Sequence, residues 1–200
     1  FDVKNKRWSK EMLDIVGLTE EQMPDVYESY DVVGNIKESV AEALNLNPNA
    51  KIIAGGGDQA VAAVGTGTVG HGMCNVSLGT SGVVFVASQE YSQIEDNALH
   101  MFAHADGKYH FMGVTLAAAA SNEWWMKNVL ESSDYNGEQE GFTKLGDNNV
   151  YYLPYLMGER TPYNNPNAKG CFIGMTMETS RADMTGAVLE GVAFSLRDSL

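Results

Sequence analysis

The chain has 200 residues, of which 44% are hydrophobic and 20% are charged, so it is long enough and apolar enough to bury a core. Its formal net charge of −13 argues against a nucleic-acid-binding protein, because phosphate backbones require a basic face. The sequence contains no run of about 18 apolar residues, so we expect no transmembrane helix. Cys74 and Cys171 are the only cysteines and do not make a disulfide framework. We therefore expect no nucleic-acid or membrane partner. We also expect the protein to reside in a reducing compartment, the cytoplasm.

Two short helices are predicted near the N-terminus. The first lies within residues 8–18 and is stopped by Gly17. The second lies within residues 35–48, where Asn35 can cap it and Pro48 follows its end. Their apolar residues recur at helical spacing: Trp8, Met12 and Val16 in the first, and Ile36, Val40, Ala43 and Leu44 in the second.

The stretch "KIIAGGGDQAVAAV" predicts a buried strand, a turn at residues 55–57 and a helix of small residues over 58–64. This order places the Asp58 carboxylate at a strand end beside helix N–H groups, which favour its ionised form. An ionised aspartate beside a cavity can accept a hydroxyl proton. Two interpretations stay open: Asp58 is a helix N-cap in a structural turn, or it is a catalytic base.

The stretch "CNVSLGTSGVVFVAS", residues 74–88, predicts a hairpin around the tight turn Gly79-Thr80-Ser81-Gly82. A glycine-flanked turn with two hydroxyls offers N–H groups to the phosphates of a nucleotide, although an ordinary hairpin turn is the alternative. A hydroxyl-activating carboxylate and a phosphate-binding turn are together the parts that phosphoryl transfer from a nucleotide to an alcohol requires.

The remaining elements alternate between strands and helices. Strands are expected at 98–104 and 109–114, a helix at 115–130, and an exposed loop or an irregular helix at 131–149. An aromatic and Pro/Gly-rich connection follows at 150–170. The last helix begins at a Ser180–Asp183 cap, and its apolar residues are four apart: Met184, Val188, Val192 and Leu196. This mixture predicts an α/β class.

Two further motifs each have a structural and a functional interpretation. Gly65, Gly67 and Gly70 spell a dinucleotide-type G-x-G-x-x-G, but the spacing follows a predicted helix instead of a strand, so a loop is favoured. His100, His104 and His110 could suggest a metal site, but they lie in predicted strands and a turn, so satisfied or surface histidines are favoured.

Two other pairs of residues leave alternatives open. Glu159 and Arg160 lie in a turn, where they form either an ion pair or part of a cleft lining. Trp124 and Trp125 are adjacent, so only one of them can face the core directly, and the other covers a cleft or is partly buried.

Several blocks of the sequence, in this order, resemble the FGGY carbohydrate kinase family, and within it the kinases that act on D-xylulose. The blocks are "AGGGDQAVAAVGTGTV", "NVSLGTSGVVF", "YLPYLMGERTPYNNPNAKG" and "GCFIGMTMETSRADMTGAVLEGVAFSLRDSL". The resemblance implies an actin-like, ribonuclease H-like α/β fold. It makes residues 1–72 the end of a sugar-binding first domain and residues 73–200 the start of a nucleotide-binding second domain.

The resemblance also implies an activity, its cofactors and its site residues. The implied activity is phosphorylation of D-xylulose at O5 by ATP with Mg²⁺. Asp58 matches the family's catalytic base, and Gln59 matches a sugar-contacting position. Gly79, Thr80 and Ser81 match a phosphate-binding motif. Ala119 and Glu123 stand at nucleotide-contacting positions, where glycerol kinase relatives have glycine and glutamine.

Two family motifs have no counterpart in the chain: an early D-x-G-T-type phosphate hairpin, which would carry the magnesium ligand, and a late glycine-rich adenosine motif. The chain therefore resembles the middle of a kinase, and we expect it to be inactive by itself. We assign no metal ligand among its residues and leave a homodimer open. The alternatives are a sibling kinase for gluconate, ribulose or glycerol, or a non-catalytic actin-like nucleotide-binding module.

Overall fold

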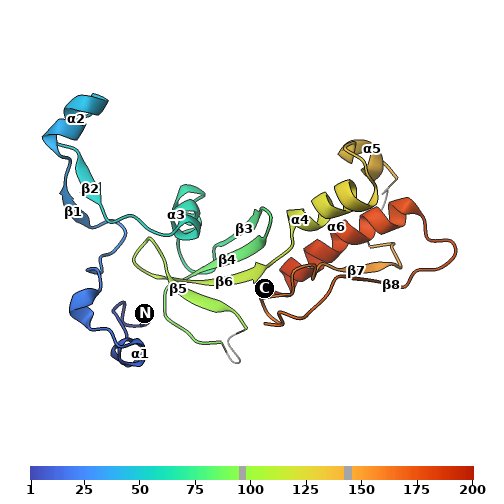
Figure 1. The fold of residues 1–200 in the computed structure, drawn as a ribbon, viewed down its shortest axis with the longest axis horizontal. Helices are drawn as coiled ribbons and strands as arrows, with labels where there is room; N and C mark the ends of the chain where they lie inside the picture. Colours follow the sequence, from blue (N-terminus) through green and yellow to red (C-terminus); the bar gives the residue numbers. More distant parts are fainter. Residues whose placement is uncertain (95–97, 142–145) are drawn as a thin grey trace. The chain divides into compact units, whose positions relative to one another are not determined.

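The computed structural model describes residues 1–94, 98–141 and 146–200 (Figure 1). The described chain divides into two compact units, which are treated separately. Unit 1 comprises Phe1–Asn75, Val86–Gln93 and Met101–Phe111, and unit 2 comprises Val76–Phe85, Ile94–His100 and Met112–Leu200. The described elements mix helices and strands, which confirms the predicted α/β class. Among the described residues, no helix has the length and apolarity needed to cross a membrane.

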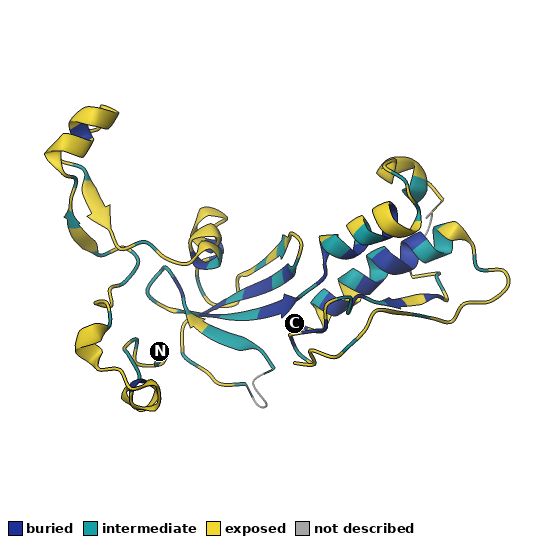
Figure 2. Cartoon of the chain, viewed as in Figure 1, coloured by how far each residue is buried: buried dark blue, intermediate teal, exposed yellow. Residues whose placement is uncertain are grey.

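Unit 1 begins with short elements, most of which are exposed (Figure 2). They are α1 (Lys10–Val16), the 3₁₀ turn η1 (Glu20–Gln22), β1 (Val32–Asn35), α2 (Glu38–Leu44), β2 (Lys51–Ile53) and α3 (Asp58–Gly65). The first predicted helix is confirmed. The Ser9 side chain caps α1, and the helix ends at Gly17, whose φ of 74° suits a residue without a Cβ. Its buried side chain is Leu13, whereas Met12 and Val16 of the predicted face are exposed.

Two predictions, one about α2 and one about β2, are wrong in detail. Asn35 does not cap α2, because it is the last residue of β1, and Lys37 occupies the N-cap position. The predicted strand at β2 is present and pairs antiparallel with β1, but it is not buried. Ile52 and Ile53 are 45% and 56% exposed. An apolar run therefore predicted the strand but not its burial, which depends on the residues that pack against it.

The four-stranded sheet has the strand order β3-β4-β6-β5. Its strands are β3 (Cys74–Leu78), β4 (Gly82–Ser88), β5 (His100–Ala103) and β6 (Tyr109–Thr115). The predicted hairpin at 74–88 is confirmed as β3 and β4, and the two predicted strands after it are β5 and β6. Most of β4 is buried. The turn before it therefore leads into a strand that is held in place by packing.

The G-x-G-x-x-G spacing lies in the connection between α3 and β3. Gly65 is the last residue of α3, and Gly67 and Gly70 have φ angles of 74° and 93°. The next element is a strand instead of a helix. The predicted loop is therefore confirmed, and the stretch lacks the strand-turn-helix context of a dinucleotide site.

The rest of unit 2 is built around one long helix. Its elements are α4 (Ala119–Trp124), the π-helical turn η3 (Trp125–Val129), α5 (Tyr135–Gln139), β7 (Tyr151–Leu153), β8 (Cys171–Ile173) and α6 (Arg181–Arg197). The predicted helix over 115–130 is confirmed as α4 and η3. The short α5 lies in the predicted loop or irregular helix of 131–149, of which 142–145 lie outside the described residues. The predicted connection at 150–170 contains β7, which pairs antiparallel with β8.

The start of α6 is confirmed at the predicted cap. The Ser180 hydroxyl oxygen accepts a hydrogen bond from the Asp183 N–H at 3.1 Å, and the Asp183 carboxylate accepts one from the Ser180 N–H at 2.8 Å. These reciprocal bonds form a capping box, which satisfies N–H groups that have no partner inside the helix. The helix then runs for 17 residues.

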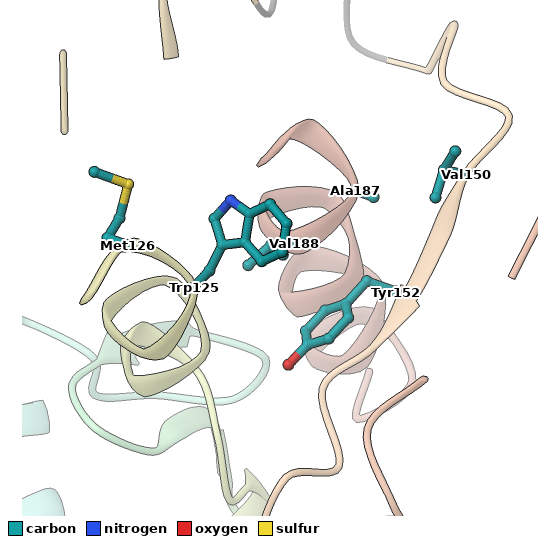
Figure 3. Packing of buried hydrophobic residues seen from close by; sticks show 6 residues of the cluster. All are labelled: Trp125, Met126, Val150, Tyr152, Ala187 and Val188. Carbon is teal, nitrogen blue, oxygen red and sulfur yellow. The ribbon is translucent and has the colours of Figure 1, made fainter. Parts of the chain in front are cut away.

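The core of unit 2 packs against α6 (Figure 3). The cluster takes side chains from η3, from the β7 segment and from α6: Trp125, Met126, Val150, Tyr152, Ala187 and Val188. Trp125 is 4% exposed, and its indole Nε1 donates a hydrogen bond to Thr185 Oγ1 at 3.0 Å. Trp124 is only partly buried and lies 6.4 Å from the Tyr152 ring. Of the two adjacent tryptophans, Trp125 therefore faces the core.

Candidate active site

Asp58 is the first residue of α3, and Gly57 occupies the N-cap position. The interpretation of Asp58 as the N-cap is therefore wrong. Its Oδ1 accepts a hydrogen bond from the N–H of the next residue, Gln59, at 2.8 Å. The Asp58 side chain is exposed, and Gln59 is half-buried. An exposed carboxylate can reach a hydroxyl group and accept its proton.

Two of the three glycines before Asp58 are required by the local structure. Gly55 has a φ of 75°, a left-handed conformation, and donates a hydrogen bond from its N–H to the Ser29 carbonyl at 3.0 Å. A Cβ on Gly56 would lie 2.9 Å from Ser29 Oγ and 3.2 Å from Val61 Cγ1, so a larger residue would displace one of them. These contacts fix the turn that connects β2 to Asp58.

The turn between β3 and β4 is held by its carbonyl groups. The Gly79 carbonyl accepts a hydrogen bond from the Ala119 N–H, and the Thr80 carbonyl accepts one from the Ala118 N–H, each at 2.9 Å. In a trans peptide the N–H points opposite to the carbonyl, so the N–H groups of Thr80 and Ser81 point away from α4. Within the described ranges, neither of these N–H groups has a hydrogen-bond acceptor. Two free N–H groups therefore face the same side of the turn.

Ala119 and Glu123 lie on α4, one helical turn apart. The Ala119 N–H is occupied by the Gly79 carbonyl, which brings Ala119 directly beside the turn. The Glu123 carboxylate forms an exposed ion pair with Lys127 and accepts a hydrogen bond from its ammonium group, which raises the pKa of Lys127. The structure thus joins Ala119 to the turn between β3 and β4, whereas Glu123 has a local partner of its own.

Gly82 ends the turn, and the neighbouring side chains leave no room for a Cβ at this position. A Cβ at this position would lie 2.8 Å from Leu196 Cδ2, 2.9 Å from Thr115 Cγ2 and 3.0 Å from the Ala118 Cβ. We expect Gly82→Ala to lower the free energy of unfolding by about 1–3 kcal/mol, the usual cost of overpacking. Urea unfolding measures this loss. Gly79→Ala is the matched control, because its nearest contact would be 3.7 Å away. Equal stability of the two variants would contradict the prediction.

Glu159 and Arg160 do not form the ion pair that was one of the two alternatives. Glu159 is 2% exposed and accepts hydrogen bonds from Thr115 and from backbone N–H groups. The exposed Arg160 donates from Nε to His100 Nε2 at 3.1 Å, and burial together with the Arg160 charge lowers the pKa of His100. Sequence reasoning missed the burial of Glu159, because its hydrogen-bond partner Thr115 lies 44 residues earlier in the chain.

The histidines have structural partners, as predicted. His104 is 2% exposed, and its Nε2 lies 3.0 Å from the Thr68 carbonyl oxygen. Its Nδ1 accepts a hydrogen bond from the Asp106 N–H at 3.1 Å, so Nε2 carries the proton of a neutral ring. His110 is also buried and lies beside His104 and Phe102. Among the described residues, no group of three or more His, Cys, Asp or Glu side chains could hold a metal ion.

His110 gives unit 1 a pH-dependent stability. Burial, and then the neighbouring His104, lower the pKa of His110 to about 4, against a weaker opposite effect of Asp106. The unfolded chain therefore binds more protons between about pH 4 and pH 6.5. The contribution, roughly 3 kcal/mol, is fully present above pH 6.5 and is lost as the pH falls towards 4.

We expect His110→Gln to flatten the dependence of the unfolding free energy on pH between about 4 and 6.5. Urea unfolding at a series of pH values measures that slope. His71→Gln is the control, because His71 is exposed. Equal slopes in the His110 variant and in the unmodified chain would contradict the prediction.

Two family models together match nearly the whole chain. Residues 1–65 match the N-terminal domain of the FGGY family of carbohydrate kinases, and residues 74–200 match the C-terminal domain of the same family. The chain is also 40% identical over 209 residues to the xylulose kinase of Klebsiella pneumoniae, covering 100% of this chain and 42% of that protein. It thus spans about two fifths of the length of the curated relatives it matches.

Solved structures agree with this assignment. A xyloylose kinase from Brucella ovis has a TM-score of 0.93 at 40% identity, covering 100% of this chain and 42% of that chain. A gluconate kinase from Lactobacillus acidophilus has a TM-score of 0.88 at 27% identity, covering 98% and 40%. These sugar kinases have the predicted actin-like, ribonuclease H-like fold. Because one family model alone covers more than half of its residues, the chain belongs to the FGGY family of carbohydrate kinases.

Proposed function

We propose that this chain takes part in the transfer of a phosphoryl group from ATP to O5 of D-xylulose, giving D-xylulose 5-phosphate. The observation that carries the proposal is Asp58, an exposed carboxylate at the first residue of α3. Among the described residues, its side chain has one hydrogen bond, which it accepts from the N–H of Gln59. The identity of 40% to a xylulose kinase, over the whole chain, supports D-xylulose as the acceptor.

Asp58 acts as the general base. It accepts the proton of the sugar hydroxyl as the hydroxyl oxygen attacks the γ-phosphorus and the bond to the leaving ADP breaks. The transition state of such transfers is loose, so the nucleophile needs positioning more than strong activation, and a weak base is sufficient. Gln59, the half-buried neighbour of Asp58, contacts the sugar.

The turn between β3 and β4 binds phosphate oxygens of ATP. The support is the orientation of the Thr80 and Ser81 N–H groups, which point away from α4, and the exposed Thr80 hydroxyl beside them. Gly79 and Ala119 hold the turn, and Glu123 extends the site along α4 towards the nucleotide. Mg²⁺ accompanies ATP in this chemistry, but the described residues offer it no cluster of carboxylates. We assign the ion no ligand here and derive no step through it.

The domain boundary and the compartment are part of the proposal. Residues 1–72 belong to the sugar-binding domain and residues 73–200 to the nucleotide-binding domain. The family-model matches to 1–65 and 74–200 support this boundary. Cys74 and Cys171 are free and exposed, as suits a reducing cytoplasm. A homodimer stays a prediction.

The test is ADP release by the encoded polypeptide that contains this chain, with D-xylulose, L-ribulose, gluconate and glycerol as acceptors. We expect turnover on D-xylulose and little on the other three. Coupling ADP to NADH oxidation follows the rate, and the phosphorylated product identifies the acceptor. Turnover on a different acceptor would contradict D-xylulose as the substrate but not phosphoryl transfer as the reaction.

Gluconate is the second candidate substrate. The specific observation that favours it is the gluconate kinase from Lactobacillus acidophilus, whose TM-score is 0.88 over 98% of this chain. Its identity of 27% is lower than the 40% to the xylulose kinase, so D-xylulose is preferred. A polypeptide that binds ATP without turnover on any acceptor would instead indicate a non-catalytic nucleotide-binding module.

A further inference from the structure

Glu159 is a buried carboxylate without a cationic partner in the part of the chain that the structure describes. It is 2% exposed, and the described ion pairs do not include it. Burying a charged group is costly unless hydrogen bonds replace the lost water. The hydrogen bonds that Glu159 accepts therefore indicate what this carboxylate holds in place.

Three donors meet at this carboxylate. Oε2 accepts a hydrogen bond from Thr115 Oγ1 at 2.7 Å, and Oε1 accepts one from the Leu116 N–H at 3.1 Å and one from the Arg160 N–H at 2.7 Å. The Thr115 hydroxyl in turn accepts from Ser195 Oγ at 2.7 Å. A carboxylate only accepts hydrogen bonds, so it directs the Thr115 proton towards itself and leaves the Thr115 oxygen free for Ser195.

Leu116 connects the carboxylate to the phosphate turn. Its N–H is bonded to Glu159, and its carbonyl accepts a hydrogen bond from the Ser81 hydroxyl at 3.2 Å. Two and three residues later, Ala118 and Ala119 donate to the turn carbonyls at 2.9 Å. The backbone from Leu116 to Ala119 therefore holds the turn through three hydrogen bonds, and Glu159 holds the start of that backbone.

We propose that Glu159 is a positioning residue for the nucleotide phosphates: it fixes Leu116, which in turn fixes the turn at Gly79-Thr80-Ser81. This inference rests on the proposed function, because it concerns the same ATP site. Without the carboxylate, the part-buried N–H groups of Leu116 and Arg160 lose their acceptor, and the backbone moves to satisfy them. A displacement of about 1 Å in a group that positions a substrate can lower the rate by a factor of about 100.

The experiment compares variants of the encoded polypeptide that contains this chain. We expect Glu159→Ala to raise the KM for ATP by about 10-fold to 100-fold and to leave the KM for the sugar within about twofold. Calorimetric titration with ADP should show the same weakening without any sugar. Glu159→Gln should restore most of the ATP affinity, because its Oε1 still accepts from the Leu116 and Arg160 N–H groups.

Val188→Ala is the control for a purely structural effect. Val188 is fully buried in the core of unit 2, so its truncation lowers stability without touching the turn. Its KM for ATP should stay unchanged. If Glu159→Ala fails to fold, Thr115→Val provides the second test, since it removes one donor to Glu159 at nearly constant volume. It should raise the KM for ATP in the same direction by about threefold to tenfold.

Provided that the unmodified polypeptide binds ATP, two results would overturn the inference about Glu159 and leave the proposed function in place. One is a KM for ATP that stays unchanged in folded Glu159→Ala or, failing that, in Thr115→Val. The other is an equal rise of that KM in Val188→Ala. An unmodified polypeptide that binds no ATP would instead overturn the proposed function, and the inference with it.

Discussion

Replacing Asp58 by Asn should reduce turnover of the encoded polypeptide by about 10²–10⁴, the usual contribution of a general base. The substitution removes the charge and the proton acceptor but keeps an oxygen that can accept from the Gln59 N–H. The fold should therefore be preserved, with a loss of about 0.3–1 kcal/mol from the weaker interaction with the helix N-terminus. Steady-state kinetics with D-xylulose and ATP measure the rate, and the KM values should change little.

Glu38→Gln is the matched control for Asp58→Asn. Glu38 is also an exposed carboxylate at the first residue of a helix in unit 1, namely α2. Its neutralisation should have the same small effect on stability and none on turnover. A loss of less than about tenfold in Asp58→Asn, with both substrates still bound, would contradict the assignment of Asp58 as the base.

Truncating Trp125 to Ala should have the largest effect on stability, a loss of about 3–5 kcal/mol in the free energy of unfolding. The ring is 4% exposed and lies 5.4 Å from the Phe172 ring, centroid to centroid. Its loss would leave a cavity, and it would also deprive Thr185 Oγ1 of the donor at 3.0 Å. Urea unfolding of the encoded polypeptide, followed by circular dichroism, measures the change.

The neighbouring Trp124→Ala provides the comparison. Trp124 is only partly buried, so the same chemical truncation should lower stability by clearly less. Equal losses for the two variants would mean that the cluster around α6 does not centre on Trp125.

The elements with local signals could be predicted from the sequence. The cap at Ser180 and Asp183 and the turn at Gly79–Gly82 need only residues a few positions apart, and both are present in the structure. Gly17 likewise ends α1 as its conformational freedom predicts. In the site, the position of Asp58 after a strand and a glycine turn was predictable for the same reason.

The elements that depend on distant partners could not be predicted. Strand β1 is short and contains Gly34, and it exists because it pairs with β2, so Asn35 ends a strand instead of capping a helix. Strand β7 pairs with β8 across a Pro/Gly-rich connection, which by itself suggests no strand. Buried Glu159 accepts a hydrogen bond from Thr115, 44 residues earlier. The residues next to Glu159 in the sequence do not indicate that bond.

The orientation of the β3–β4 turn has a consequence for how a strongly acidic chain can attract an anion. Residues 77–82 include no Lys or Arg, so a phosphate at this turn would interact with the fixed dipoles of two peptide groups and with a hydroxyl. Dipoles at contact distance are screened by dissolved ions far less than separated surface charges are. Nucleotide affinity at this turn should therefore depend only weakly on ionic strength, although the chain as a whole carries a net charge of −13.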